Sequence, residues 1–140
     1  MTSTPPKYKV NSDDDLGAVW QKLMGRGGFG RRSLWMVFLD GNDETLPVIF
    51  PMDDLPDAPE PLLIGSLRHI LDELLATTPA VAVSFLLSRP GPDAVTEFDR
   101  RWTRTLLDTV PPPTRRGPMH LATANRVRVI GPDDLLGAAS

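Results

Sequence analysis

The sequence contains no cysteine, and this absence removes several classes of function at once. The chain has no disulfides, thiolate zinc sites, iron–sulfur clusters or thiol catalysis. It also lacks any apolar run near the roughly 20 residues that span a bilayer, and its N-terminus, MTSTPPKYKV, has no apolar signal-peptide core. We therefore expect a chain with no cofactor and no membrane partner, and a cytoplasmic location.

The chain also has no excess of positive charge. The formal net charge is -3, because 18 acidic residues outnumber 15 basic ones. This balance disfavours nucleic acid as the main partner. The 140 residues and 41% hydrophobic content fit one domain with one core. The expected partner is therefore a protein, a second copy of the chain or a small molecule.

The N-terminal segment predicts an arm, a helix and a connector. Residues 1–11 are polar with two prolines, which indicates a flexible arm. Ser12 and Asp15 have the spacing of a capping box, and apolar residues recur behind them at helical spacing. These residues are Leu16, Val19, Trp20 and Leu23. The glycine-rich stretch 25–32 then connects this helix to a strand, so 12–32 form one N-terminal unit.

The remainder predicts a single α+β domain over residues 33–131, followed by a tail over 132–140 with one helical turn. Strands are expected at 33–40, 45–52, 79–88, 119–123 and 126–130, and helices over about 63–75 and 96–107. The order is α-β-β-α-β-α-β-β, and its hairpins imply a mixed sheet with helices packed on its faces. Pro47 indicates an edge strand, the unbroken apolar run at 79–88 indicates a central one, and 110–118 reads as a loop.

Several spacings in the second half resemble a known motif. The strand at 79–88 ends in LSRP at 87–90, and Thr96, Asp99 and Thr103 follow after a glycine turn. Met119-His120 begins a late strand. This arrangement resembles the JAB/MPN fold, a sandwich similar to cytidine deaminases, and within it the RadC-like proteins. That family carries His-x-His-Pro, then Ser, Asp and Thr at the spacing of Thr96, Asp99 and Thr103, and a late Asp-His.

The resemblance implies a zinc peptidase site that this chain has lost. In the family two imidazoles and one carboxylate hold the metal, and an upstream glutamate serves as general base. Leu87 and Arg89 stand where the histidines would be, and only Asp99 remains of the three ligands. The one glutamate of the first hairpin, Glu44, falls at its turn. We expect no metal site and no metal-dependent peptidase activity.

Thr96 and Asp99 have a structural interpretation that needs no metal. Thr-x-x-Asp at the start of an apolar helical pattern is typical of a capping box. In that position Asp99 also favours the positive end of the helix dipole. The sequence therefore predicts Thr96 and Asp99, like Ser12 and Asp15, as structural caps.

Two functions remain open from sequence. The first is a non-catalytic JAB/RadC-like scaffold that binds a protein or peptide or self-associates, since domains of this fold pair through helices and sheet edges. The alternative is a small-ligand binder or metal-independent enzyme that reuses a cleft around Arg89, Asp99 and His120. The candidate binding residues are these three together with Arg100 and Trp20. Guanidinium groups here would suit a carboxylate, a phosphate or an acidic partner.

Overall fold

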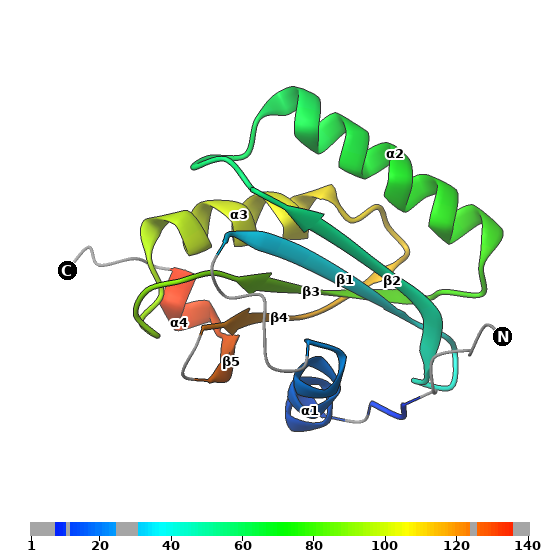
Figure 1. Cartoon of the computed structure of the whole chain (residues 1–140). Helices are drawn as coiled ribbons and strands as arrows, with labels where there is room; N and C mark the ends of the chain where they lie inside the picture. The colour runs from blue at the N-terminus through cyan, green and yellow to red at the C-terminus, as the bar shows by residue number, and fades with distance from the viewer. Residues whose placement is uncertain (1–7, 11, 25–30, 124–125, 136–140) are drawn as a thin grey trace, which may run out of the picture.

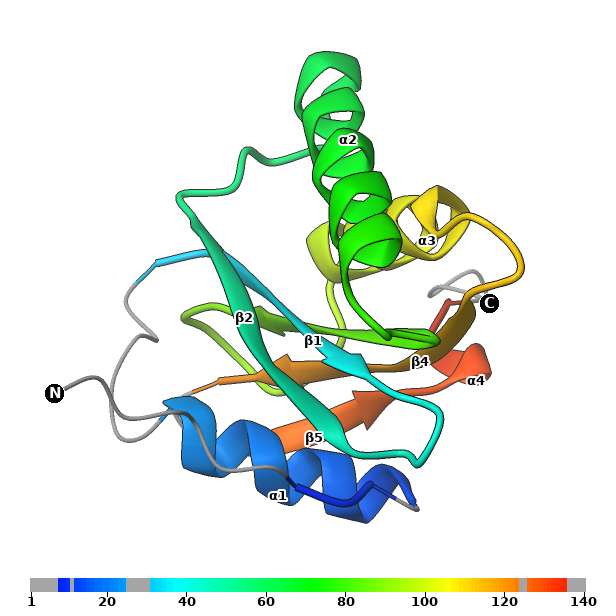
Figure 2. The same cartoon turned by 90° about the vertical axis from the view of Figure 1, so that its right-hand side faces the viewer.

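The structure is a computed structural model of the chain, and it describes residues 8–10, 12–24, 31–123 and 126–135. The elements run in the order α1 (Asp13–Met24), β1 (Ser33–Leu39), β2 (Thr45–Asp53), α2 (Pro61–Thr77), β3 (Ala82–Ser88), α3 (Glu97–Thr109), β4 (Arg115–Ala122), β5 (Val127–Ile130) and α4 (Pro132–Leu135). One sheet separates α2 and α3 on one side from α1 on the other (Figures 1 and 2). The predicted α+β class is confirmed.

The sheet is mixed and has five strands in the order β2-β1-β3-β4-β5. β3 and β4 pair in parallel, and the other neighbours pair antiparallel. β3 is the middle strand and every residue in it is buried, which confirms the prediction of a central strand covered on both faces. β2 is an edge strand, so the prediction from Pro47 is also confirmed.

Side chains of β3 alternate between two cores. Val83, Phe85 and Leu87 belong to the larger cluster, which packs against α2 and α3. Leu86 belongs to a smaller cluster formed with Leu16 and Trp20 of α1, together with Val37 and Ala122. This alternation follows from the period of two along a strand. It decides which residues can share a site, because neighbouring positions of one strand reach opposite sides of the sheet.

The helix starts follow the sequence prediction. The Ser12 hydroxyl accepts a hydrogen bond from the Asp15 backbone N–H at 3.1 Å, which confirms Ser12 as the cap of α1. The predicted stop at Gly25 and the connector over 25–30 lie outside the described residues. None of the described helices combines the length and apolar character that crossing a membrane requires.

Two local predictions are wrong. The flexible arm does not extend through residues 8–10, because Tyr8 and Val10 hydrogen-bond to the β1–β2 hairpin and Lys9 forms a bridge with Glu44. The rest of that arm, residues 1–7 and 11, lies outside the described residues. The loop predicted over 110–118 is shorter than expected, because β4 already begins at Arg115. The first residues of β4 pair with the start of β3, a long-range contact that local composition does not reveal.

Candidate functional site

The N-terminus of α3 is closed by two reciprocal hydrogen bonds. The Asp99 backbone N–H donates to the Thr96 hydroxyl at 3.4 Å, and the Thr96 backbone N–H donates to Asp99 Oδ2 at 2.9 Å. Thr96 has extended backbone angles, as an N-cap requires. The predicted capping box is therefore present.

Arg89 uses all five of its side-chain N–H donors inside the protein. Nε and Nη2 donate to Asp99 Oδ1 and Oδ2 at 2.8 and 2.7 Å, a two-point ion pair. The other three bonds reach backbone carbonyls of Pro90, Pro92 and Ala94 at 3.0, 2.8 and 2.9 Å. Arg89 is only 4% exposed and Asp99 is fully buried. The guanidinium therefore holds the loop 89–96 and the start of α3 in one arrangement.

Both carboxylate oxygens of Asp99 accept hydrogen bonds. Asp99 Oδ2 accepts hydrogen bonds from Arg89 Nη2 and the Thr96 backbone N–H, and Oδ1 accepts one from Arg89 Nε. A buried charge is tolerated only when it is paired and its remaining hydrogen-bonding positions are filled. Arg89 and Asp99 satisfy this requirement for each other, so neither presents an unsatisfied charge to an incoming ligand.

The positions around Asp99 do not provide other metal ligands. Leu87 is fully buried in the larger core, and Glu44 lies at the β1–β2 turn. That turn is at the opposite end of the sheet from Arg89, because Leu39 pairs with Ala82 at the start of β3 whereas Arg89 follows its end. Within the described part of the chain, no group of three or more His, Asp or Glu side chains is arranged to hold a metal ion.

His120 lies on the other side of the sheet from Arg89 and Asp99. Its backbone pairs with Leu86, and its Nε2 lies 3.6 Å from the position that a Cβ on Gly17 of α1 would occupy. Asp99 instead belongs to α3, on the opposite face (Figure 2). The predicted cleft around Arg89, Asp99 and His120 is therefore wrong, because the sheet separates the imidazole from the ion pair.

A hollow of about 440 Å³ opens between α1 and β5, with His120 among its lining residues. Asp14, Gly17, Ala18 and Gln21 form its α1 side. Val127, Arg128 and Val129 form its β5 side. His120 is 2% exposed, so it lies at the floor of this hollow rather than on the open surface. Sequence reasoning singled out His120 but not its neighbours, because the packing of α1 on β5 is a long-range contact.

Trp20 is not available as a docking residue. It is fully buried and packs in the smaller cluster with Leu16 and Leu86. Its Nε1 is buried without a hydrogen-bond partner among the described residues. Its predicted place on the apolar side of the N-terminal helix is confirmed, whereas its predicted role in contacting a partner is wrong.

The arginines of α3 diverge instead of forming one anion site. Arg100 pairs with Glu97 at 3.1 Å and also donates to the Val95 carbonyl at 3.2 Å. Arg104 donates to the Leu135 carbonyl of α4. Arg101 is half-exposed and lies 3.6 Å from Glu97. Each side chain already has an acceptor inside the protein, so α3 presents paired rather than free positive charge.

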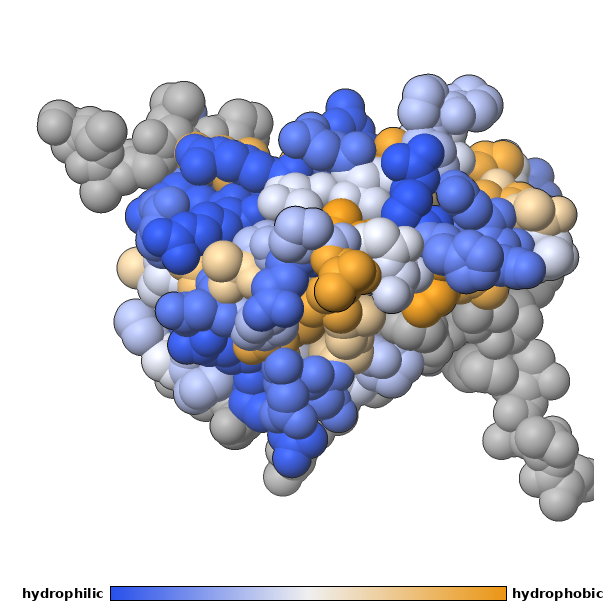
Figure 3. Space-filling model, turned by 90° about the horizontal axis from the view of Figure 1, so that it is seen from above, coloured by the Kyte–Doolittle hydropathy of each residue, from blue (hydrophilic) through white to orange (hydrophobic). Residues whose placement is uncertain are grey.

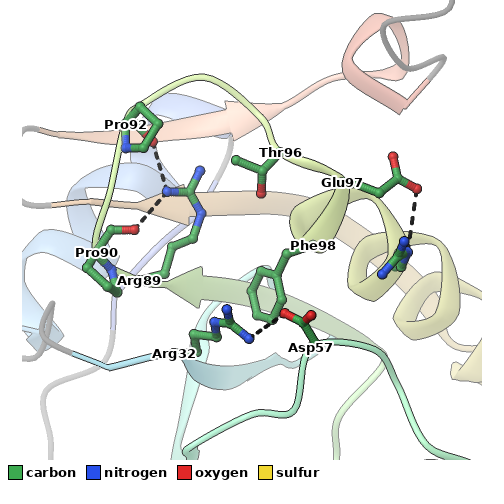
Figure 4. Close-up of a pocket in the computed structure, with 9 residues that line it drawn as sticks. Arg32, Asp57, Arg89, Pro90, Pro92, Thr96, Glu97 and Phe98 are labelled. Atoms are coloured by element: carbon green, nitrogen blue, oxygen red, sulfur yellow. Dashed lines mark hydrogen bonds and ion pairs between the residues drawn. The ribbon is translucent and has the colours of Figure 1, made fainter.

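A second hollow, of about 420 Å³, lies beside the loop 89–96 (Figure 4). Arg32 and Asp57 form one wall, paired at 2.7 Å, and the Arg32 guanidinium lies over the Phe98 ring at 4.7 Å. Nothing in the sequence indicated that Arg32 and Asp57 would pair, because the two residues are far apart along the chain.

Two comparisons with known proteins found no match. A scan against protein-family models found no matching family, and a search of curated proteins found no matching sequence. The likeness to the JAB/MPN fold thus depends on the expected order of elements and on the spacings at 87–103 and 119–120.

Proposed function

We propose that this chain is a non-catalytic domain, similar to the JAB and RadC-like proteins, that acts by binding a protein or peptide partner or a second copy of itself. The observation that carries the proposal is the buried bond between Arg89 and Asp99. Asp99 is the one ligand position that the chain retains under this resemblance, and an arginine already neutralises it. A catalytic zinc site needs three protein ligands and an open fourth position, so the arrangement favours a scaffold over a peptidase.

The way in which the loop 89–96 is held also favours a scaffold. The buried Arg89 side chain donates to three carbonyl groups of the loop. The hydroxyl of Thr123, which directly follows β4, donates to the Asp93 carboxylate of the same loop. Arg126 adds an exposed ion pair with Asp93 at 3.7 Å. A loop fixed from two sides provides a rigid surface, which lowers the entropy lost when a partner binds.

Three surfaces are candidates to meet a partner: the N-terminal helix, the edge strand β2 and the acidic loop 53–61. The helix with Trp20 directs that side chain inward. The edge strand β2 contains Pro47 and Pro51, which lack backbone donors and so disfavour the addition of another strand. The acidic loop 53–61 has part of its charge paired, since Arg32 binds Asp57. The outer side of α2, which follows this loop, is also exposed.

Elemental analysis tests the proposal at its central point. The protein is purified without chelators and without an affinity tag that carries metal, and its zinc content is measured. We expect less than about a tenth of an equivalent, since one ligand does not make a zinc site. Stoichiometric zinc would overturn the proposal. A matched Asp99→Asn sample would then show whether Asp99 is a ligand.

The His120 hollow supports a second candidate function, the binding of a small polar molecule. Ligand-observed NMR with a library of polar fragments tests it, with Gly17→Leu as a variant that fills the hollow. Fragments that bind the natural chain and not the variant support the candidate. Fragments that bind both equally, or none at all, rule it out.

A further inference from the structure

β5 is the last strand of the sheet at the end opposite β2, and no described segment pairs with its outer edge. The two edge strands differ in composition, because β2 contains Pro47 and Pro51 whereas β5 contains no proline. Every residue of β5 therefore has a backbone N–H as well as a backbone carbonyl. An edge strand of this kind is able to pair with an added strand.

The pairing of β5 with β4 determines which of its backbone groups point outward. In an antiparallel ladder, hydrogen-bonded residue pairs alternate with pairs whose N–H and C=O groups point away from each other. The Thr123 N–H donates to the Arg126 carbonyl at 3.0 Å, so that pair is hydrogen-bonded. Val127 and Val129 lie one and three positions further along, in pairs of the second kind. Both valines therefore direct their N–H and C=O groups away from β4.

One of these four outward groups already has a partner inside the protein. The Val129 carbonyl accepts a hydrogen bond from Arg128 Nε at 3.2 Å. A carbonyl oxygen has two lone pairs, so it is able to accept a second bond. The two valines can thus exchange backbone hydrogen bonds with one added strand.

The hollow of about 440 Å³ between α1 and β5 lies beside these backbone groups. Val127, Arg128 and Val129 all line it, although successive side chains of a strand point to opposite faces of the sheet. The hollow is therefore bounded by the backbone of β5 and not by one face alone. Figure 2 shows α1 beside this edge of the sheet. A strand added to β5 would have alternate side chains in the hollow, the arrangement by which such sites select their peptides.

The opposite side of the molecule has a different surface chemistry. Viewed from the α2 side, apolar groups lie scattered among hydrophilic ones (Figure 3). The backbone groups of α2 are bonded within the helix, so this helix contacts a partner through its side chains. β5 instead offers backbone donors and acceptors at the fixed spacing of a strand.

The wall of the hollow carries an exposed negative charge. Asp14 of α1 is exposed, lines the hollow and makes no ion pair among the described residues. Arg128 is paired with Asp134 at 2.9 Å, and its side chain belongs to the face of the sheet opposite to that of Val127 and Val129. The charge that a ligand meets in the hollow is therefore negative and complements a lysine or arginine side chain.

Asp14 lies toward the Val129 end of β5. The position of a Cβ on Gly17 would be 3.6 Å from Nε2 of His120, and His120 pairs with Val129. Asp14 is about one turn closer to the start of α1 than Gly17 is. In Figure 2 the start of α1 and the end of β5 lie on the same side of the molecule. A basic side chain would therefore approach Asp14 from the position opposite Val129, not from the position opposite Val127.

We infer that an extended peptide pairs antiparallel with β5, between β5 and α1, with a lysine or arginine opposite Val129 and a β-branched residue opposite Val127. In the antiparallel direction the basic residue comes first, and the β-branched residue follows two positions later. Each of the two exchanges backbone hydrogen bonds with its valine, and the N–H of the residue between them points away from β5. The inference rests on the proposed function, a domain that binds a peptide, and deepens it by naming the surface and the class of peptide.

A second copy of β5 fits this edge less well than a basic peptide does. The antiparallel register that pairs Val127 with the partner's Val129 places Arg128 opposite the partner's Arg128, and like charges directly opposite each other are destabilising. The peptide complex itself should be weak, because β5 has only four residues. We expect a dissociation constant of about 0.1–1 mM.

Nuclear magnetic resonance of the isotope-labelled full chain tests the inference, with the capped peptide Thr-Lys-Thr-Val-Thr as the probe. We expect the amide signals of Val127 and Val129 to shift as the peptide is added. Hydrogen exchange of these amides should slow about tenfold when the free peptide is at about ten times its dissociation constant.

Methylation of the peptide backbone distinguishes strand addition from binding through side chains alone. An N-methyl group on the lysine or on the valine removes a donor to β5, so we expect binding to weaken about tenfold. An N-methyl group on the central threonine is the matched control, because that N–H points away from β5. The control should change the dissociation constant by less than about twofold.

A charge exchange tests the role of Asp14. Asp14→Lys should weaken binding of the lysine peptide about two- to tenfold, because an exposed attraction is replaced by a repulsion. The same variant should prefer a peptide with glutamate in place of the lysine. Asp108→Lys makes the same change at an exposed position of α3, on the other face of the sheet, and should leave both peptides unaffected.

Filling the hollow tests its part in the site. Ala18→Leu adds bulk at an exposed position that lines the hollow, so we expect it to weaken peptide binding more than about tenfold. Ala76→Leu makes the same exchange at an exposed position of α2 and should leave binding unchanged. Circular dichroism confirms the folding of each variant.

Four results would overturn the inference. The first is no shift of the Val127 and Val129 amides at about 10 mM peptide, well above the expected dissociation constant. The second is equal binding of all the methylated peptides, and the third is a site that Ala18→Leu does not weaken. The fourth is protection of the β5 amides that rises with protein concentration alone, which would assign this edge to a second copy. None of these results changes the zinc content, so failure here is distinguishable from failure of the proposed function.

Discussion

A single arginine determines how the chain passes from β3 to α3. Arg89 is 4% exposed and binds Asp99 and three loop carbonyls. An alanine at this position would remove all five donors and leave the Asp99 carboxylate buried without its counter-charge. The residue is therefore structural first, whatever surface the loop offers to a partner.

Arg89→Ala is expected to lower the free energy of unfolding by about 3–5 kcal/mol, the cost of breaking a buried ion pair. Urea denaturation measures it. Arg101→Ala is the matched control, since its side chain is half-exposed and its ion pair with Glu97 is long. The control should change stability by less than about 1 kcal/mol. An Arg89→Ala chain as stable as the control would show that the pair contributes nothing net.

A second residue-scale prediction concerns a hydroxyl with no partner. Thr103 is fully buried, and its Oγ1 has no hydrogen-bond partner among the described residues. Thr103→Val replaces that hydroxyl with a methyl group of similar size, so we expect stability to stay unchanged or to rise by up to about 1 kcal/mol. Thr109→Val is the contrast, because the Thr109 hydroxyl donates to the Thr105 carbonyl at 2.7 Å. Thermal melts should order the two variants accordingly, and a larger loss in Thr103→Val would contradict the prediction.

At the scale of elements, β3 and β4 approach each other too closely for a side chain at Gly117. A Cβ there would lie 1.9 Å from Ser84 Oγ and 3.1 Å from Ser84 Cβ. The pairing of these strands shifts register between Val83 and Phe85, next to this contact. Glycine at 117 is thus required by the packing of the two strands.

Gly117→Ala should destabilise the protein by about 1–3 kcal/mol through overpacking. In a Ser84→Ala background the cost should fall, because the nearest atom, Ser84 Oγ, is absent. A double-mutant cycle by chemical denaturation measures the coupling between the two sites. If Gly117→Ala lowers stability equally in both backgrounds, the strain does not come from the contact with Ser84 Oγ.

The elements also show which sequence predictions could succeed. The Thr96 cap is local, because both partners lie within three residues, and it was predictable from spacing. The separation of His120 from Asp99 was not predictable in this way. It depends on the pairing of His120 with Leu86 in the neighbouring strand, and a shift of one residue in that register would turn the His120 side chain to the opposite face of the sheet. The resemblance placed both residues near one cleft, whereas the sheet lies between them.

The binding of Arg89 to the loop carbonyls could not be predicted from sequence for a related reason. The carbonyls of Pro90, Pro92 and Ala94 converge on one guanidinium only when the loop has a particular path. Proline and glycine indicate a turn but not the direction of its carbonyl groups. The ion pair itself links positions that the sequence had already singled out.

For the whole molecule, the two faces of the sheet are unequally covered. α2 and α3 bury the larger cluster, and α1 covers the smaller one (Figure 2). Two polar atoms on the α1 side, Trp20 Nε1 and Ser84 Oγ, are buried without hydrogen-bond partners among the described residues. Each such group costs about 1–3 kcal/mol. The α1 side should therefore contribute less to stability than the opposite side.

We expect α1 to open before the rest of the domain, because regions with few buried apolar contacts unfold locally at lower free energy. Native-state hydrogen exchange should show lower protection for the amides of α1 than for those of β3, whose residues are all buried. Ser84→Ala should reduce the difference in protection between α1 and β3, since it removes one of the unpaired polar groups on this side of the sheet. Equal protection in α1 and β3 would instead mean that both layers unfold as one cooperative unit. Opening of α1 would also uncover His120, so exchange of its neighbours in β4 should rise together with that of α1.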